Sequence, residues 1–133
     1  MPVSYADAAR LVQAAHAKAA AIGARISVVV VDEGAHILAL GRMDGAMPLS
    51  PKIAEGKAVG AAMLARDGGA IAQMAQDRPA FFSAISAMNR VPMVPGIGSL
   101  PIKKDGIIVG AIGISGAKPE QDLECAEAAL SAL

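Results

Sequence analysis

The chain has 133 residues with 12 basic and 12 acidic side chains, and 54% of its residues are hydrophobic. This length suits one domain, so we expect residues 1–133 to form a single unit. The balanced charge argues against a nucleic-acid partner, because binding phosphates requires a basic excess. Charged residues interrupt every apolar run before about 18 residues, so the sequence predicts no membrane span. The N-terminus lacks the pattern of a signal peptide, and we expect a cytoplasmic protein.

The apolar surplus of this small chain predicts a subunit interface. A domain of this size has a large surface relative to its volume, and that surface needs polar cover. Apolar surface beyond that balance is most simply buried between copies, so we expect a homo-oligomer. The single Cys125 excludes an internal disulfide and a cysteine-based metal cluster. We expect it to be buried as a small apolar residue.

The N-terminal third predicts a helix followed by a strand. Apolar residues recur at helical spacing over residues 5–22, with Ser4 as the expected N-cap and Gly23 as the stop. The β-branched run over residues 26–31 is typical of a strand buried on both faces. A helix packed beside a buried strand is therefore the first expected layer of the fold.

The next segment predicts the second half of a hairpin and a long helix. Residues 35–40 form the expected second strand, after a turn at 32–34. The sequence GRMDG follows, and Ser50 and Pro51 then predict a helix over residues 50–66 with Ser50 as its N-cap. Many of the residues in this helix are glycine or alanine, so we expect it to pack very close to its neighbour.

The middle of the chain is less regular. We expect two short helices, over residues 70–76 and 79–87. Residues 88–99 are rich in proline and glycine and predict an irregular loop, with a short edge strand near Met93. A loop of this length in a small domain is often functional.

The C-terminal third predicts a second hairpin and a last helix. Strands are expected over residues 100–103 and 107–114, around the turn at Asp105-Gly106. The last helix begins at Pro119, with acidic residues in its first turn. Two hairpins with flanking helices predict an α+β domain on an antiparallel sheet.

Three glycines near the C-terminus are spaced as G-x-x-G-x-x-G. A dinucleotide-binding loop has the spacing G-x-G-x-x-G between a strand and a helix. Here Gly110 and Gly113 fall inside a predicted strand, where we expect them to allow close packing. Gly116 instead turns the chain into the last helix, where backbone N–H groups could receive an anion.

The two histidines are the candidate ligands of a metal or cofactor. His16 lies at the edge of the apolar face of the first helix, where its ring either reaches a pocket or is simply hydrated. His36 opens the expected second strand. Neither lies in a spacing such as H-E-x-x-H, so the sequence predicts no metal site.

Arg42, Asp44 and Lys57 are the charges nearest the expected end of the sheet. One interpretation is an Arg42–Asp44 pair that closes a turn, with Lys57 exposed. The other is that these side chains line a ligand pocket. Composition alone favours the turn.

The chain resembles the GlcG/HbpS family in three segments, VVVVDEGAHILALGRMDGA, SPKIAEGKAVGAA and GSLPIKKDGIIVGAIGISGAKPEQDLECA. This family includes the haem-binding protein HbpS, the glycolate-operon protein GlcG and the C-terminal domain of PduO. The resemblance implies a profilin-like fold, with an antiparallel sheet of about five strands flanked by helices. It also implies homo-oligomers that range from dimers to octamers. It tips the interpretation of Arg42 and Asp44 towards a ligand pocket.

The first function that the resemblance implies is binding of haem or a related tetrapyrrole, for storage, sensing or carrying. Such a site needs an axial ligand for the iron and an apolar slot for the macrocycle. His16 is the candidate ligand, and one of the seven methionines is an alternative.

The second implied function is an enzyme or binding protein that acts on an organic acid in a catabolic pathway. Arg42 and Lys57 would hold the carboxylate together with N–H groups near Ser99 and Gly116. Asp44 would serve as a proton acceptor. Ser99 stands where the family usually has glycine, in Gly-Gly-x-Pro, and adds a hydroxyl to that loop. A third interpretation, a purely structural partner protein, stays open.

Overall fold

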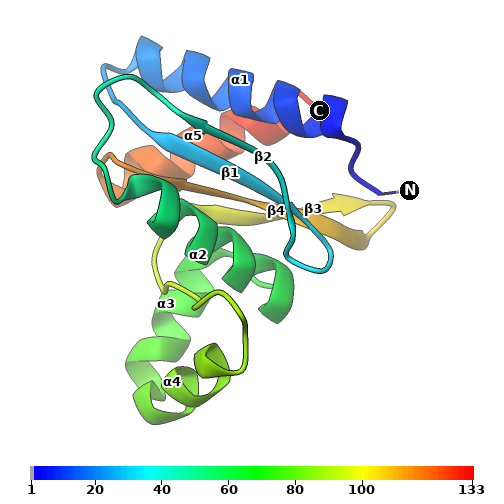
Figure 1. The fold of residues 1–133 in the computed structure, drawn as a ribbon, viewed down its shortest axis with the longest axis vertical. Coiled ribbons are helices and arrows are strands. Elements are labelled where there is room, and N and C mark those ends of the chain that lie inside the picture. Colours follow the sequence, from blue (N-terminus) through cyan, green and yellow to red (C-terminus); the bar gives the residue numbers. More distant parts are fainter. Residues whose placement is uncertain (1) are drawn as a thin grey trace.

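The computed structural model describes residues 2–133, which form an α+β fold with a four-stranded antiparallel sheet (Figure 1). The elements are α1 (Tyr5–Ala21), β1 (Ser27–Asp32), β2 (Ile37–Arg42), α2 (Ser50–Leu64), α3 (Gly68–Asp77), α4 (Pro79–Ala87), β3 (Ser99–Lys104), β4 (Ile107–Ser115) and α5 (Pro119–Ser131). The strand order is β2-β1-β4-β3, so the two hairpins meet through β1 and β4. No helix within residues 2–133 has the length and apolar character needed to cross a bilayer.

The expected sheet of about five strands is wrong by one strand. The segment around Met93 is coil, because its backbone groups bond to helices instead of to a strand. Met93 N donates to Ser86 Oγ at 3.0 Å, and Val94 N donates to the carbonyl of Gly56 at 3.1 Å. These bonds tie the loop after α4 to the end of α4 and to the middle of α2.

Helices cover both faces of the sheet. Figure 1 shows α1 and α5 on one face and α2 on the other, with α3 and α4 extending away from the sheet. Val28 and Val30 of β1 point towards α1 and α5, whereas Val29 and Val31 pack under α2. Both faces of β1 are therefore buried, as its β-branched sequence predicts. Cys125 of α5 is also buried, as expected.

Gly113 sets the distance between α2 and the sheet. A Cβ atom at this position would lie 2.2 Å from the carbonyl oxygen of Ala54 and 2.6 Å from the amide nitrogen of Ala58. The backbone of α2 thus rests directly on β4, and the alanines of α2 fill the remaining space. The prediction that the strand glycines serve close packing is confirmed.

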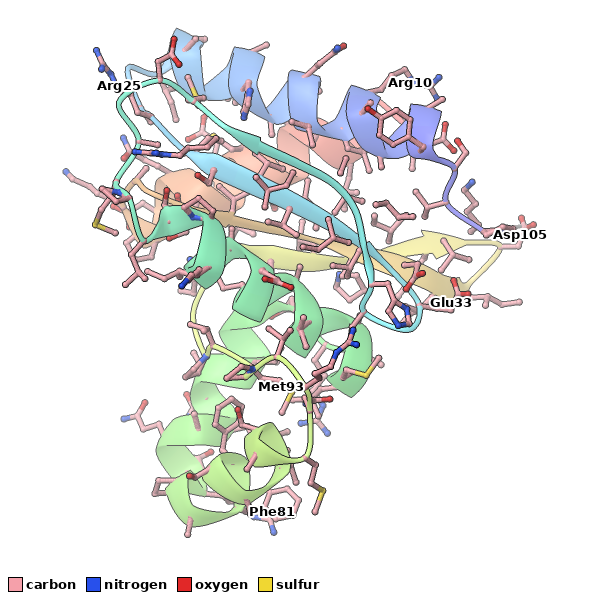
Figure 2. All side chains as sticks on the ribbon, in the orientation of Figure 1. Arg10, Arg25, Glu33, Phe81, Met93 and Asp105 are labelled. Carbon is pink, nitrogen blue, oxygen red and sulfur yellow. The ribbon has the colours of Figure 1, made fainter. Side chains whose placement is uncertain are left out.

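A third apolar cluster joins α2 to α3 and α4. Val59, Ile71, Phe82 and Met93 are its buried members. Figure 2 shows Met93 beside α2 and Phe81 on the outer part of α4. The loop after α4 therefore holds the projecting helix pair against the rest of the domain.

The two predicted N-caps have different outcomes. Ser4 caps α1, because its Oγ accepts a hydrogen bond from Asp7 N at 3.0 Å. The N-cap prediction for Ser50 is wrong: Ser50 is the first residue of α2 and its side chain is buried. Its Oγ donates to the carbonyl of Met47 and lies 2.8 Å from Ser27 Oγ. Ser50 thus fastens the start of α2 to the sheet.

Candidate functional site

A groove of about 830 Å³ runs along the C-terminal half of α1 and the end of β2. Its floor consists of small residues of α1 and the turn after it, and its polar groups come from both segments. The lining residues are His16, Ala17, Ala20, Gly23, Ala24, Arg25, Arg42, Met43 and Asp44. Three of the sequence candidates, His16, Arg42 and Asp44, therefore line one groove.

His16 is half-buried at the edge of the face of α1 that packs on the sheet. Its Nε2 lies 2.9 Å from the carbonyl oxygen of Gly41 in β2. Because a carbonyl only accepts hydrogen bonds, Nε2 carries the proton, and Nδ1 of the neutral ring keeps its lone pair. Gly41 makes room for this arrangement, since a Cβ there would lie 2.8 Å from His16 Cε1.

Arg42 does not pair with Asp44. Its Nε and Nη2 both donate to the carbonyl of Ala46, at 3.2 and 2.7 Å. Within residues 2–133 no ion pair joins Arg42 to an acid. Arg42 therefore closes the turn through its own backbone contact, and its remaining N–H groups stay available at the rim of the groove.

Two further groove residues, Arg25 and Met43, were missed by the sequence interpretation. The guanidinium of Arg25 lies across Gly45, where a Cβ would fall 2.2 Å from its Nη1. Met43 Sδ accepts a hydrogen bond from Ile26 N at 3.4 Å. In the sequence, Arg25 stands between the helix stop at Gly23 and the start of β1, which gives no sign of a site. Only the folded turn brings Arg25 into the same groove as Arg42.

Lys57 lies in a separate, buried cluster. Its side chain is only 9% exposed, against the expectation of an exposed lysine in the turn interpretation. Its Nζ donates to the carbonyls of Ile97 and Ile114, both at 2.9 Å, and lies 3.4 Å from Asp122 Oδ2. Asp122 was missed, because its place in the first turn of α5 indicated only a favourable helix dipole. The cluster joins α2, α5, the end of β4 and the loop before β3.

Burial disfavours the charged form of both Lys57 and Asp122. Burial lowers the pKa of Lys57, although the charge of Asp122 opposes the change. Burial likewise raises the pKa of Asp122 from 3.8 to about 6, against the opposing effect of Lys57 and of the hydrogen bond from Ala117 N. Both directions have the same cause, since charged groups are poorly solvated in an apolar interior.

We expect Asp122 to make the fold more stable as the pH falls from 6 to 4. Its pKa is higher in the folded chain than in the unfolded chain, so folding takes up a proton in this range. The contribution of Asp122 is fully present below its unfolded pKa and is lost as the pH rises through about 6.

Urea denaturation of the wild type and Asp122→Asn at several pH values measures this effect. The difference in free energy of unfolding, wild type minus variant, should grow by about 1–3 kcal/mol between pH 6 and 4. A difference that is flat or falls with decreasing pH would contradict the assignment.

The remaining candidates, Ser99 and Gly116, do not line the groove either, and of the two only Ser99 is buried. Ser99 Oγ is buried and has no hydrogen-bond partner within residues 2–133. Gly116 has φ of 127° and lies against the backbone of Arg25, where a Cβ would be 2.6 Å from the Arg25 carbonyl oxygen. The anion position suggested near Gly116 is filled by the chain itself, because Ala117 N donates to Asp122 Oδ1 at 3.1 Å.

The geometry therefore divides the sequence candidates into two groups. The groove is lined by an imidazole, two arginines and several small side chains, and it is open to solvent. The Lys57 cluster has its charges committed to internal partners. Within residues 2–133 no group of three histidine, cysteine or acidic side chains could hold a metal ion. The groove is thus the better candidate site for an external ligand.

Comparisons with known proteins agree with the resemblance read from the sequence. A family model described as haem degrading protein HbpS-like matches residues 3–131. An uncharacterized 15.0 kDa protein from the dhaT-dhaS intergenic region of Citrobacter freundii is 34% identical over 128 residues, which cover 96% of this chain and 89% of that protein. GlcG of Escherichia coli K12 is 36% identical over 92 residues, which cover 68% of this chain and 63% of GlcG. That match thus spans less than two thirds of GlcG.

A solved structure gives the same result for the fold. The crystal structure of a PduOC–haem complex superposes with a TM-score of 0.89 at 27% sequence identity. The alignment covers 100% of this chain and 96% of that chain. The arrangement of helices on both faces of the sheet is therefore shared with a protein crystallised with haem.

Proposed function

The chain belongs to the HbpS-like family, and on that premise we propose that it binds haem or a related tetrapyrrole in the groove beside His16. One observation carries the proposal. His16 is anchored through Nε2 to the Gly41 carbonyl, beside a floor of small residues and two arginines. A ring nitrogen held by a backbone carbonyl is the usual arrangement of a histidine that binds a metal, because the bond fixes the ring and its tautomer.

The shape of the groove fits a flat ligand. Ala17 and Ala20 lie on the last turns of α1 and Ala24 lies in the turn after it, and these small side chains leave a shallow surface on which a macrocycle could rest. A volume of about 830 Å³ is in the range of cofactor sites. The chain has only three aromatic residues, so the slot depends on alanines and Met43 instead of on stacking rings.

The charges of the groove fit the two propionates of haem. Arg25 and Arg42 lie at its rim, and Asp44 is the one acid that lines it. Arg42 already donates to Ala46, and its unused N–H groups suit a carboxylate. The ligand would therefore lie with its propionates towards the arginines and its iron towards His16.

We further propose a role in haem storage, sensing or carrying, in a cytoplasmic protein whose residues 1–133 act as one domain of profilin-like type. When bound, haem would supply the redox or gas-binding chemistry of its iron. The residues of the chain would bind and orient it.

The organic-acid alternative has less support. It requires Arg42 and Lys57 to hold one carboxylate together, whereas Lys57 Nζ has three internal partners and does not line the groove. Asp44 remains a candidate proton acceptor only for a ligand bound beside Arg42.

Hemin titration tests the proposal. We expect wild-type protein to give a saturable Soret band, and His16→Ala to weaken binding by at least about 100-fold, because even a supporting partner of a metal ligand is worth about 10–100-fold in affinity. His36→Ala is the matched control, since His36 is the only other histidine and does not line the groove. Equal loss of the band in both variants, or no band in the wild type, would refute the proposal.

We propose a homo-oligomer between a dimer and an octamer. Ile37 and Leu40, both 46% exposed, lie along the edge strand β2, and exposed Met47 and Leu49 follow in the next loop. An exposed apolar strip on an unpaired edge is a common site of subunit contact.

Light scattering in dilute buffer measures the oligomeric state. The expected mass is a multiple of 13.3 kDa, and Leu40→Glu should lower it. A monodisperse wild-type species near 13.3 kDa would rule the oligomer out.

A further inference from the structure

We propose that the hollow beside the β1–β2 turn is a second binding site, and that it takes a small organic carboxylate. The hollow has a volume of about 170 Å³ and lies between this turn, α2 and the loop after α4. Its polar lining is His36, Asn89 and Arg90, and its apolar lining includes Val59, Met63 and Val91. The polar and apolar groups thus face the same small space.

Asp32 holds His36 in position. Oδ1 of Asp32 accepts from the backbone N–H groups of Gly34 and His36, both at 2.9 Å, and lies 3.3 Å from His36 Nδ1. The carboxylate orients the imidazole with Nδ1 as the donor, and in the protonated ring Nε2 carries the second N–H group, which can donate to a ligand oxygen. The prediction that His36 opens the second strand is wrong, because β2 begins at Ile37 and the imidazole folds back over the turn.

The turn itself is built for this arrangement. Gly34 leaves room for the ring, since a Cβ there would be 3.0 Å from His36 Nδ1. Ala35 has φ of 67°, a left-handed conformation that costs energy for a residue with a side chain. Burial alone would raise the pKa of Asp32, but hydrogen bonds from the backbone of His36 and Gly34 and the charge of His36 keep that pKa below its ordinary value. Asp32 therefore stays ionised, with its Oδ1 bound inside the turn.

The groups facing the hollow favour an anion. Arg90 lines the hollow from the loop after α4, and it forms no ion pair within residues 2–133. The amide of Asn89 adds two N–H donors. A guanidinium fork beside an imidazole and an amide matches the oxygens of a carboxylate.

The size and the apolar wall specify the ligand further. A volume of about 170 Å³ is too small for a tetrapyrrole or for a typical drug-sized ligand. The contact with Val59, Met63 and Val91 suits a short carbon chain, which an inorganic anion lacks. The ligand class is therefore a carboxylate with a few carbon atoms.

This site is separate from the groove beside His16. Figure 2 shows Arg25, which lines the groove, at one end of the sheet and Glu33, in the β1–β2 turn, at the other end. No lining residue is shared between the groove and the hollow. The second site can thus be tested independently of haem binding.

Nuclear magnetic resonance of the histidine rings provides the test, with propionate as the probe at pH 7 and constant ionic strength. The chain has two histidines, so two ring signals are expected, and His16→Ala assigns them. Propionate should shift the His36 signal saturably and at a lower concentration than it shifts the His16 signal, because Arg25 and Arg42 beside His16 can also attract a carboxylate. Arg90→Gln should weaken propionate binding by at least about tenfold, whereas Arg66→Gln, which removes an exposed arginine outside the hollow, should not.

Three outcomes would overturn the assignment. The first is no saturable shift of the His36 signal. The second is an equal shift with propionamide, the neutral analogue, because the carboxylate would then be irrelevant. The third is equally tight binding of inorganic phosphate, because the apolar wall would then contribute nothing. Normal propionate binding in His16→Ala would keep this site distinct from the haem proposal.

Discussion

Replacing Lys57 with methionine should destabilise the fold by about 3–5 kcal/mol, the cost of leaving one partner of a buried ion pair uncompensated. The substitution keeps the length of the side chain and removes the charge. Asp122, which is 2% exposed, would keep a carboxylate in an apolar interior without its cation. The carbonyls of Ile97 and Ile114 would also lose their donor. Urea denaturation at pH 7 measures the loss.

The double variant Lys57→Met/Asp122→Asn is the control for this interpretation. An asparagine keeps an oxygen that accepts from Ala117 N and removes the unpaired charge. The double variant should therefore recover most of the stability that Lys57→Met loses, because neutral replacements of a buried pair are often tolerated. A single variant within about 1 kcal/mol of the wild type would show that the pair is not needed.

Gly113→Ala should cost about 3 kcal/mol or more, at or above the upper end of the usual penalty for overpacking. The added methyl would meet the backbone of α2 at Ala54 and Ala58, and not the flexible end of a side chain. To relieve the overlap, α2 must move away from β4, which opens the alanine-lined interface on that face of the sheet. Thermal unfolding of the purified variant measures this loss.

Gly60→Ala tests whether the loss is specific to that contact. Gly60 lies in α2, and a Cβ there would be 3.3 Å from Ile71 Cδ1, the mobile end of a side chain. Alanine inside a helix is favoured over glycine by about 1 kcal/mol, so this variant should match or exceed wild-type stability. If Gly113→Ala is equally stable, the close approach of α2 to the sheet is not a constraint on this fold.

The sequence predicted the elements whose signals are local. The β-branched run of β1 predicts the first hairpin, and the turn at Gly106 predicts the second. Pro119 predicts the start of α5 at the observed residue. Ser4 was identified as a cap because its partner lies three residues away. In each case the atoms that decide the structure lie within a few residues of one another.

The sequence could not predict contacts between distant segments. Lys57 and Asp122 are 65 positions apart, and a lysine in an alanine-rich helix gives no sign that it is buried. Ser50 resembles an N-cap, but its Oγ donates to the Met47 carbonyl and lies 2.8 Å from Ser27 Oγ on the sheet. The edge strand expected near Met93 in the irregular loop does not form, because Ser86 binds the Met93 backbone, and the local sequence does not show this contact. Tertiary partners override local preference at these positions.

The candidate site shows the same division. The edge position of His16 follows from helical periodicity, and the groove does contain it. Arg42 binds the Ala46 carbonyl instead of Asp44, and Arg25 lines the same groove as Arg42. Both features depend on how the turn after β2 folds back, which the local sequence does not show. GRMDG is therefore both a turn and one wall of the groove.

The position of the iron in crystals soaked with hemin tests the central claim most directly. Anomalous diffraction at the iron absorption edge locates the metal without assumptions about the ligand pose. We predict one iron peak per chain in the groove between α1 and the end of β2, bound to the His16 ring, with the propionates towards Arg25 and Arg42. An iron peak beside His36 or between α3 and α4, or none in the groove, would contradict the proposed haem site.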